Sequence, residues 1–242
     1  MRIRDVGRMM LDLAYPPRCP VCDGPAPPGR PVCPECARKI EPYRGSRCAK
    51  CSKPVRPGET LCRDCAGTRH LYQRGFAPFV YDDTMREVMA AFKYRGRREY
   101  APFLAGLLFR FAKSRIADMR PDVIVPVPLH AERLAGRGYN QAEELAAELS
   151  LLTGIPMDSE RLVRREKTAA MKKLGRQSRR ESMRGVFAAR RGNRDGERVL
   201  IVDDIYTTGS TVDSASCALT ASGAAETDFL AVCIGGGFMV RY

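Results

Sequence analysis

The sequence contains no tryptophan, and aromatic side chains make up only 7% of its 242 residues. So few aromatic residues argue against a stacking surface as the main feature of the fold. No stretch approaches the roughly 20 apolar residues that a transmembrane helix needs. Met1–Tyr15 does not resemble a secretory signal either, because Asp12 breaks its apolar run. We therefore expect a cytoplasmic protein whose first residues form a short amphipathic helix.

Acidic residues are few relative to basic ones: the sequence has 28 aspartates and glutamates and 41 lysines and arginines, so the net charge is +13. The excess is unevenly distributed. Residues 161–194 hold 13 basic and two acidic side chains, a local net charge of +11. Residues 1–69 carry a nominal +7, which two zinc ions bound by eight thiolates would lower to about +3. An anionic partner is therefore expected to meet the second half of the chain.

Cysteine is abundant in the N-terminal part of the chain, residues 1–69. Eight of the ten cysteines form Cys-x-x-Cys motifs separated by 10, 11 and 10 residues: Cys19 with Cys22, Cys33 with Cys36, Cys48 with Cys51, and Cys62 with Cys65. Two such motifs supply the four sulfurs of a closed tetrahedral zinc site. We predict two structural zinc ions, because a segment so short and so poor in periodic hydrophobic residues needs them in order to fold.

Consecutive pairing of these motifs is the favoured arrangement, because the segment reads as one zinc ribbon written twice. Interleaved pairing, disulfides and an iron–sulfur cluster are the alternatives. Cys217 and Cys233 lie in apolar surroundings and are predicted to be buried. His70 follows Cys65 by five residues, but eight thiolates already complete two sites. It is therefore not assigned as a ligand.

Residues 70–242 alternate β-branched runs with helical patterns, which indicates an α/β domain with a parallel sheet. The pattern predicts strands at residues 76–81, 122–127, 198–202 and 227–234. It predicts helices at residues 84–93, 100–114, 140–152 and 211–222. A ligand of such a sheet is expected at the carboxyl ends of its strands.

Residues 199–211, VLIVDDIYTTGST, join a buried strand, two acids and a hydroxyl-rich loop to the start of a helix. Gly209 lets the backbone approach an anion, and the loop amides form an anion-binding nest. Four hydroxyls add donors: those of Thr207, Thr208, Ser210 and Thr211. Asp203 and Asp204 would repel a phosphate unless sugar hydroxyls or Mg²⁺ lay between them. The segment therefore predicts a phosphorylated sugar as ligand, and an ordinary turn with capping Thr and Ser is the alternative.

The same segment resembles the phosphoribosyl pyrophosphate (PRPP) motif of type I phosphoribosyltransferases. Together with the cysteine motifs, FKYRGR at 92–97 and DVIVPVPLHAERLAGRGYNQAEELA at 122–146, it resembles the ComF family. Those proteins are competence-associated and join a double zinc ribbon to a phosphoribosyltransferase-like domain. The resemblance implies a type I phosphoribosyltransferase fold, a parallel sheet flanked by helices with a hood at 70–115, and it implies PRPP with Mg²⁺ as ligands.

The resemblance also implies roles for individual residues. Asp203 and Asp204 would contact the ribose hydroxyls, and Thr207–Thr211 would hold the 5′-phosphate. The pyrophosphate loop would comprise Val127, Pro128 and Leu129, with Arg133 and Arg137 beyond it either neutralising pyrophosphate or forming a solvated helix face. Residues 164–185 match a mobile basic loop, whose candidates for transition-state stabilisation are Arg164, Arg165 and Lys167.

The basic loop departs from the family pattern at two positions. Met171 stands where a glutamine is usual, and Ser182 stands where an asparagine is usual. If those side chains touch the substrate, acceptor choice or activity differs here. The acceptor and the oligomeric state are left open by the sequence.

Two functions follow from these observations. The first is Mg²⁺-dependent binding or transfer of a phosphoribosyl group from PRPP, linked to DNA uptake and natural transformation. The second is a catalytically silent PRPP-fold protein that binds single-stranded DNA through its basic segment, which includes Arg176, Arg179 and Arg180. The expected partners are therefore PRPP, single-stranded DNA and the DNA-uptake machinery.

Overall fold

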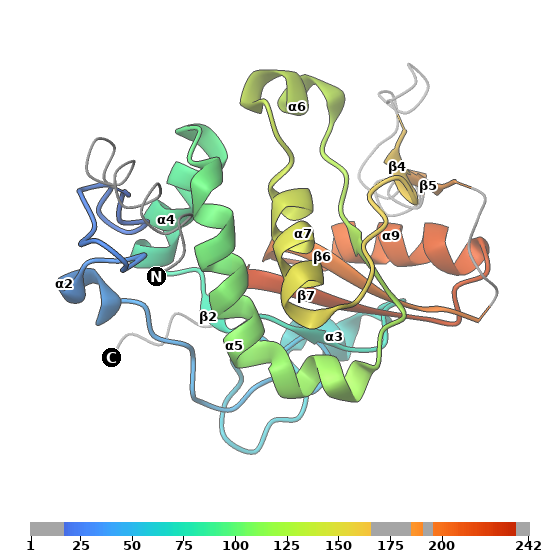
Figure 1. Ribbon diagram of the computed structural model, residues 1–242. Coiled ribbons are helices and arrows are strands. Elements are labelled where there is room, and N and C mark those ends of the chain that lie inside the picture. The colour runs from blue at the N-terminus through green and yellow to red at the C-terminus, as the bar shows by residue number, and fades with distance from the viewer. Residues whose placement is uncertain (1–16, 166–184, 191–195, 236–242) are drawn as a thin grey trace.

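The computed structural model describes residues 17–165, 185–190 and 196–235. Its centre is a parallel sheet with helices on both faces (Figure 1). Among the described residues, no helix has both the length and the apolar character needed to cross a membrane.

The central sheet has five strands: β1 Gly75–Phe76, β2 Phe79–Val80, β3 Val123–Pro126, β6 Arg198–Tyr206 and β7 Glu226–Ile234. The strand order is β1-β7-β6-β3, and β2 also pairs with β7. Every pairing is parallel. In the register of β6 and its neighbour β3, which lies at the edge of the sheet, Pro126 of β3 lies opposite Val202 of β6. The chain that leaves β3 therefore starts beside the acid pair that follows Val202.

The helices of this domain are α4 Asp83–Tyr94, a 3₁₀ turn η1 Arg98–Tyr100, α5 Ala101–Met119, α6 Ala131–Arg137, α7 Gln141–Thr153 and α9 Ser210–Ala221. Polar side chains cap the starts of α4, α6 and α7. Asp82 accepts a hydrogen bond from the Met85 N–H at the start of α4, and Asn140 accepts one from the Ala142 N–H at the start of α7. Two short helices, α2 Pro34–Ala37 and α3 Arg63–Gly67, belong to the Cys-rich segment.

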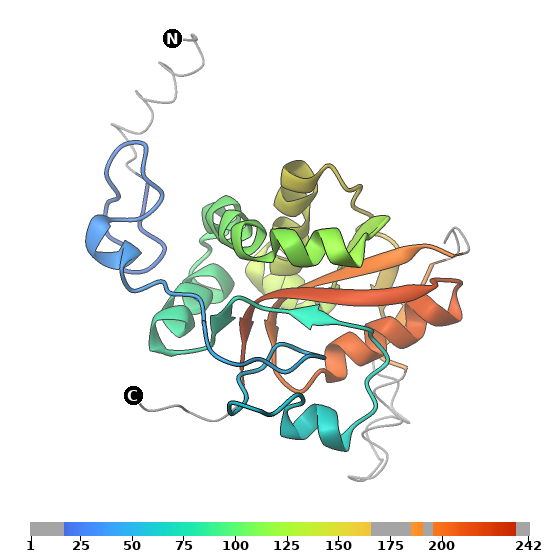
Figure 2. The same cartoon turned by 90° about the horizontal axis from the view of Figure 1, so that it is seen from below.

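Both faces of the sheet are apolar, and successive strand residues alternate between them. In β6, Leu200 and Val202 pack into the hydrophobic cluster of α4, α5 and α7. Val199 and Ile201 face the opposite way and pack with α9. This alternation is the two-residue period of an extended strand, and burial on both faces explains the continuous hydrophobic run of the sequence. Figure 2 shows the two helical layers on either side of the sheet.

The expected α/β architecture is confirmed, with corrections to its elements. The predicted strand 76–81 is two short strands, because Pro78 has no N–H for the ladder. Strand β6 continues through the acid pair to Tyr206, and α5 runs five residues beyond the predicted 114 to Met119. Cys233 is buried as predicted, whereas Cys217 is only partly buried.

Besides the short α2, α3 and η1, one helix and one pair of strands had no counterpart in the sequence analysis. The first is α6, which stands clear of the sheet in Figure 1. The second is an antiparallel pair of strands, β4 Leu162–Arg164 and β5 Phe187–Ala189, which meet at either end of the basic loop. Both are too short to show a hydrophobic period of their own.

The contact between β1 and β7 leaves no room for a side chain at Gly75. A Cβ at this position would come within 1.8 Å of the Phe229 ring. Gly75→Ala should therefore lower the free energy of unfolding by about 1–3 kcal/mol, the usual cost of overpacking, as measured by urea denaturation. Gly106→Ala in α5 is the control, because no atom lies within 4 Å of its Cβ position. A Gly75→Ala protein as stable as the wild type would contradict this packing.

Candidate functional site

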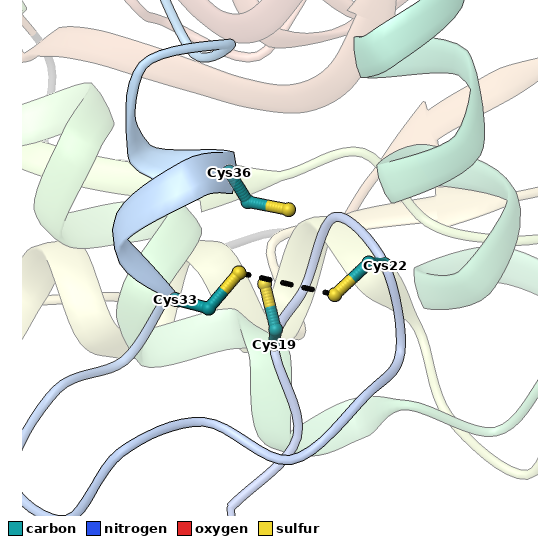
Figure 3. A group of neighbouring side chains, drawn as sticks. All are labelled: Cys19, Cys22, Cys33 and Cys36. Atoms are coloured by element: carbon teal, nitrogen blue, oxygen red, sulfur yellow. Dashed lines mark hydrogen bonds between the residues drawn. The ribbon is translucent and has the colours of Figure 1, made fainter.

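The eight N-terminal cysteines gather into two groups of four. The sulfurs of Cys19, Cys22, Cys33 and Cys36 lie within 4.8 Å of one another, and so do those of Cys48, Cys51, Cys62 and Cys65. The preferred consecutive pairing is thus the one that the structure shows. Figure 3 shows the first group, in which a loop and the start of α2 point their thiols at one centre.

The geometry of both groups fits a zinc ion. A tetrahedral site with Zn–S bonds of about 2.3 Å has sulfurs about 3.8 Å apart. The Sγ atoms of Cys22 and Cys33 are 4.0 Å apart, and those of Cys51 and Cys62 are 3.6 Å apart. Burial raises the pKa of Cys19, but hydrogen bonds from the backbone N–H groups of Cys33, Cys22 and Val21 and from the Cys22 side chain together outweigh it and lower that pKa to about 7. Such N–H donors favour the thiolate form that zinc binds.

The two ribbons repeat the same backbone at an interval of 29 residues. An antiparallel bridge joins Arg18 to Pro25 in the first ribbon, and another joins Arg47 to Pro54 in the second. The residue after the first Cys-x-x-Cys has a positive φ in both, 57° at Asp23 and 64° at Ser52. The prediction of one ribbon written twice is therefore confirmed in its local structure.

The predicted phosphate loop connects β6 to α9. Gly209 is the N-cap of α9, with φ of 84°, and no side chain caps the helix. Thr and Ser thus do not cap this helix, and its first N–H groups are left for another acceptor. The hydroxyls of Thr208 and Ser210 lie 2.9 Å apart, and Thr207, Thr208 and Thr211 are exposed. The loop therefore offers N–H and O–H donors to an anion at the positive end of a helix.

The acid pair lies at the same edge of the sheet. The Asp204 N–H donates to Asp203 Oδ1 at 2.8 Å, and Lys93 Nζ lies 2.9 Å from Asp204 Oδ1. The Lys93 and Asp204 side chains are only 16% and 14% exposed, so this ion pair is shielded from water. The sequence analysis quoted the segment that contains Lys93 without assigning the lysine a role. Its partner is 111 residues away, and no local pattern reports such a contact.

Asp203 carries an unusual proton affinity. Burial, and then the adjacent charge of Asp204, raise its pKa from 3.8 to about 7, although the Asp204 N–H, Lys93 and Arg164 act in the opposite direction. A carboxyl group in this position changes its charge near neutral pH. Displaced pKa values of this kind are common where a ligand or a metal completes the electrostatics of a site.

The loop after β3 lies beside the acid pair. The Val127 N–H donates to the Val202 carbonyl at 2.9 Å, which continues the β3–β6 ladder by one residue. Asn140 fixes the other side of this loop, since its Nδ2 donates to the Val127 carbonyl at 3.1 Å. Val127 is buried, while Pro128 and Leu129 are partly exposed. The predicted pyrophosphate loop and acid pair are therefore neighbours.

The two arginines beyond this loop lie in α6. Arg133 is exposed and Arg137 is partly buried, where its Nη1 donates to Gln141 Oε1 at 2.7 Å. The Arg137 guanidinium also lies 4.8 Å from the centroid of the exposed Tyr94 ring. His130 accepts a hydrogen bond from the Glu132 N–H at the start of α6.

Arg164 ends β4, and its guanidinium lies 5.4 Å from the Phe187 ring centroid of β5. Desolvation and then the positive charge of Arg133 lower its pKa, whereas Asp203 raises it. Arg164 therefore shares one electrostatic environment with a residue of α6 and with the acid pair. Arg165 is exposed, and its N–H donates to the Val186 carbonyl. Lys167, Met171, Arg176, Arg179, Arg180 and Ser182 lie outside the described residues.

Two family models match the chain. The double zinc ribbon domain matches residues 10–66, and the phosphoribosyl transferase domain matches residues 105–236, more than half of the sequence. The fold and the metal sites thus define a double zinc ribbon joined to a phosphoribosyltransferase domain. Among solved structures, the purine phosphoribosyltransferase of Pyrococcus horikoshii overlaps 55% of this chain and 74% of its own, with 18% identity and a TM-score of 0.38.

Curated relatives carry the names of competence and DNA utilization proteins. Competence protein ComFC of Bacillus subtilis is 30% identical over 64% of this chain and 61% of its own length, less than two thirds of that protein. DNA utilization protein YhgH of Salmonella typhimurium is 31% identical over 67% of this chain and 72% of its own, and that of Escherichia coli O157:H7 is 29% identical over 93% and 94%. The chain therefore belongs to the ComF family.

The raised pKa of Asp203 predicts how stability depends on pH. The folded state holds this proton up to pH of about 7, whereas an unfolded aspartate releases it near 3.8. The contribution of Asp203 is thus present at low pH and is lost as the pH rises to about 7. Asp203→Asn should therefore raise the Tm relative to wild type, by a difference that grows between pH 4 and 7 and is constant above 8.

Calorimetric melting at several pH values checks this expectation. Asp118→Asn is the control, because Asp118 is exposed near the end of α5, which leads into the start of β3, whereas the acid pair lies toward the carboxyl end of the parallel sheet. A Tm difference between Asp203→Asn and wild type that stays the same from pH 4 to 8 would contradict the assignment.

Proposed function

We propose that this protein binds PRPP together with Mg²⁺ at the carboxyl end of β6, and that it transfers or holds a phosphoribosyl group in a process linked to DNA uptake. The observation that carries the proposal is one continuous unit. The acid pair, the hydroxyl loop and the uncapped start of α9 follow one another within nine residues, 203–211. Sugar hydroxyls need carboxylate acceptors and a phosphate needs N–H donors, and this unit presents both in sequence order.

The remaining residues take the roles that the geometry allows. The 5′-phosphate would bind at Thr207–Thr211, and the ribose hydroxyls at Asp203 and Asp204. Pyrophosphate would lie against Val127–Leu129, with Arg133 and Arg137 of α6 as its cations. Because β3 and β6 are adjacent, both ends of PRPP could be held by neighbouring strand ends.

The donor set at this edge also suits Mg²⁺, which prefers carboxylate, hydroxyl and phosphate oxygens. Bound there, the ion would neutralise pyrophosphate charge. Lys93 holds Asp204 in its present position, 2.9 Å from Nζ. A ligand that brings a cation would compete with this lysine for the same carboxylate.

The basic loop would supply further positive charge during transfer. Arg164 lies in the electrostatic environment of Asp203 and Arg133. With Arg165 and Lys167 it would stabilise the charge that develops on departing pyrophosphate. Release of pyrophosphate on addition of a nucleobase or an amine would distinguish transfer from binding alone.

Calorimetric titration of the zinc-loaded protein with PRPP tests the proposal. We expect micromolar binding that requires Mg²⁺. The Asp203→Asn/Asp204→Asn double variant should bind at least about 100-fold more weakly, because each lost charged hydrogen bond costs about 1.5–3 kcal/mol. Asp118→Asn is the control and should bind like wild type. Equal binding by the double variant, or no binding by the folded wild type, would contradict the proposal.

Single-stranded DNA binding through the basic loop is a second candidate, favoured by the net charge of +11 over residues 161–194 and by the names of the relatives. Replacing Arg176, Arg179 and Arg180 with glutamine should reduce the slope of log affinity against log salt by about 2, since each phosphate contact contributes about 0.7. Fluorescence anisotropy with a labelled oligothymidine measures the slope. The Asp203→Asn/Asp204→Asn variant serves as its control, and an unchanged slope in the arginine variant would exclude this segment.

A further inference from the structure

The two zinc ribbons are packed very differently against the rest of the protein. The buried cysteines of the first, Cys19 and Cys36, form a small cluster of their own with Ala26. Those of the second belong to the large cluster that also holds Tyr206 at the end of β6 and Val212 in α9. In Figure 2, α3 of the second ribbon lies on the side of the sheet that α9 covers, whereas α2 of the first lies to one side of the domain. The second ribbon is thus built into the domain beneath the phosphate loop.

His70, five residues after the last cysteine of the second ribbon, lies directly against the phosphate loop. A Cβ placed on Gly209 would meet the Tyr206 hydroxyl at 2.6 Å and His70 Cε1 at 2.9 Å. The side chain of His70 is only 1% exposed. These two rings therefore form a floor under Gly209, on the side of the loop away from solvent, and they leave space there for glycine alone.

His70 also ties the connecting segment to the first turn of α9. Its Nδ1 lies 2.7 Å from Asp213 Oδ2, and the Leu71 N–H donates to Asp213 Oδ1 at 2.8 Å. Asp213 in turn donates its own N–H to the Gly209 carbonyl at 2.8 Å. Because a carboxylate only accepts hydrogen bonds, Nδ1 is the ring nitrogen that carries a proton. A short chain of hydrogen bonds thus links His70 to the backbone of Gly209.

The other nitrogen of this ring has no such partner. Within the described residues, Nε2 of His70 is buried without a hydrogen bond. A buried polar atom without a partner costs stability, so a purely apolar ring would pack here at lower cost. The bond from Nδ1 to Asp213 is what a histidine supplies at this position and an apolar ring does not.

A stack of side chains continues from His70 to the second ribbon. The His70 ring stacks on Tyr72 at 4.9 Å, and the Tyr72 and Tyr206 hydroxyls lie 2.7 Å apart. Lys53 of the ribbon places Nζ 5.8 Å from the Tyr206 ring centroid and 2.5 Å from Asp64 Oδ2. The Lys53 side chain is only 3% exposed, although its partner Asp64 is 46% exposed, so the lysine itself lies within the protein.

The thiols of the second group lie close to this stack. Tyr72 and Tyr206 belong to the same buried cluster as Cys48, Cys51 and Cys62. Lys50, between Cys48 and Cys51, places its Nζ 5.3 Å from the Tyr72 ring centroid. The two tyrosines therefore lie between the second group of cysteines and the phosphate loop.

We propose that His70 is a positioning residue for the phosphate loop: through Asp213 and Gly209 it keeps the first turn of α9 in the shape that binds a phosphate monoester, and it makes that shape depend on the second ribbon and not on the first. This inference rests on the proposed function and adds to it the residue that connects a structural metal site to the ligand. His70 touches no ligand itself. It acts on the backbone that does.

Titration with two small ligands tests the role of His70. Ribose 5-phosphate probes the phosphate loop, and pyrophosphate probes the loop after β3. His70→Ala and His70→Phe should each weaken ribose 5-phosphate binding about tenfold, the equivalent of one hydrogen bond, and change pyrophosphate binding less than about twofold. His70→Asn can still donate to Asp213, so it should recover most of the affinity for ribose 5-phosphate.

Thr227→Val is the matched control, because it removes a buried hydrogen bond of 2.9 Å between Thr227 and Ser216 elsewhere on α9. It should lower the Tm and leave both affinities unchanged. The His70→Ala/Asp213→Asn double variant should bind ribose 5-phosphate no more weakly than whichever of the two single variants has the lower affinity, since the two residues act as one unit.

The metal dependence is tested with cysteines at equivalent positions of the two ribbons. Cys36→Ser and Cys65→Ser should each reduce the zinc content from two ions per chain to one, as measured by elemental analysis. Only Cys65→Ser should weaken ribose 5-phosphate binding. An equal effect of both variants, or of neither, would overturn the distinction between the ribbons.

The outcomes separate this inference from the function on which it rests. Wild-type binding of ribose 5-phosphate that His70→Ala and His70→Phe leave unchanged would overturn the role of His70 and leave the proposed function standing. Equal loss of both ligands in the His70 variants would reduce His70 to a general structural role and also overturn it. A folded, zinc-loaded wild type that binds neither PRPP nor ribose 5-phosphate would overturn both.

Discussion

The parallel pairing of β3 with β6 is the interaction on which the candidate site depends. Pro126 lies opposite Val202, so the last residue of one strand is next to the residue that precedes the acid pair of the other. One further ladder bond, from the Val127 N–H to the Val202 carbonyl, carries the loop after β3 past Asp203. A shift of this register by one residue would exchange Val199 and Ile201 with Leu200 and Val202 between two closely packed clusters, and side chains of different shape would then have to fit spaces that are already filled. The hydrophobic core therefore fixes the spacing between the two loops.

This arrangement has an electrostatic cost that the surrounding side chains only partly offset. Two adjacent carboxylates lie at a buried strand end, and burial raises the pKa of Asp203 to about 7. Lys93 offsets the charge of one of them through its 2.9 Å contact with Asp204. Arg164 acts on Asp203 from β4, but the positive charge of Arg133 opposes the protonated form of Arg164. The guanidinium groups of Arg133 in α6 and Arg164 in β4 therefore repel one another unless an anion lies between them. A site that binds a highly charged ligand has such an imbalance of charge before the ligand is bound.

Much of this could be predicted from the sequence, because its strongest signals are local. Four Cys-x-x-Cys motifs fix the metal chemistry, and the equal spacing of the two halves favours the consecutive pairing that the structure shows. The strand, acids, loop and helix of residues 199–211 are contiguous, so their order alone places them. Lys93 and His70 were missed as members of the site for the opposite reason: their partners, Asp204 and Asp213, are more than a hundred residues away in the chain. The extension of β6 through Asp203 and Asp204 was also missed, because pairing with β7 as far as Ile234 overrides the weak strand propensity of aspartate.

The two ribbons have the same local structure but contact the phosphoribosyltransferase domain in different ways. Each ribbon contacts the domain through the residue after its first Cys-x-x-Cys motif, but this residue differs between the two copies. Asp23 of the first accepts from Arg97 at 2.8 Å and from Tyr100 at 2.7 Å, contacts with the start of α5 at the edge of the domain. Ser52, 29 positions later, accepts from the Ala77 N–H at 2.9 Å, and Arg47 donates to the carbonyls of Ala77 and Pro78, the point where the edge strand is broken. The second ribbon therefore satisfies backbone groups of the broken edge strand. The first instead contacts side chains of the domain, those of Arg97 and Tyr100, and the Tyr100 hydroxyl also donates to the Cys19 carbonyl at 3.4 Å. Loss of zinc from the first ribbon should unfold that ribbon alone. Loss of zinc from the second should also expose the edge of the sheet on which β7 and the phosphate loop depend.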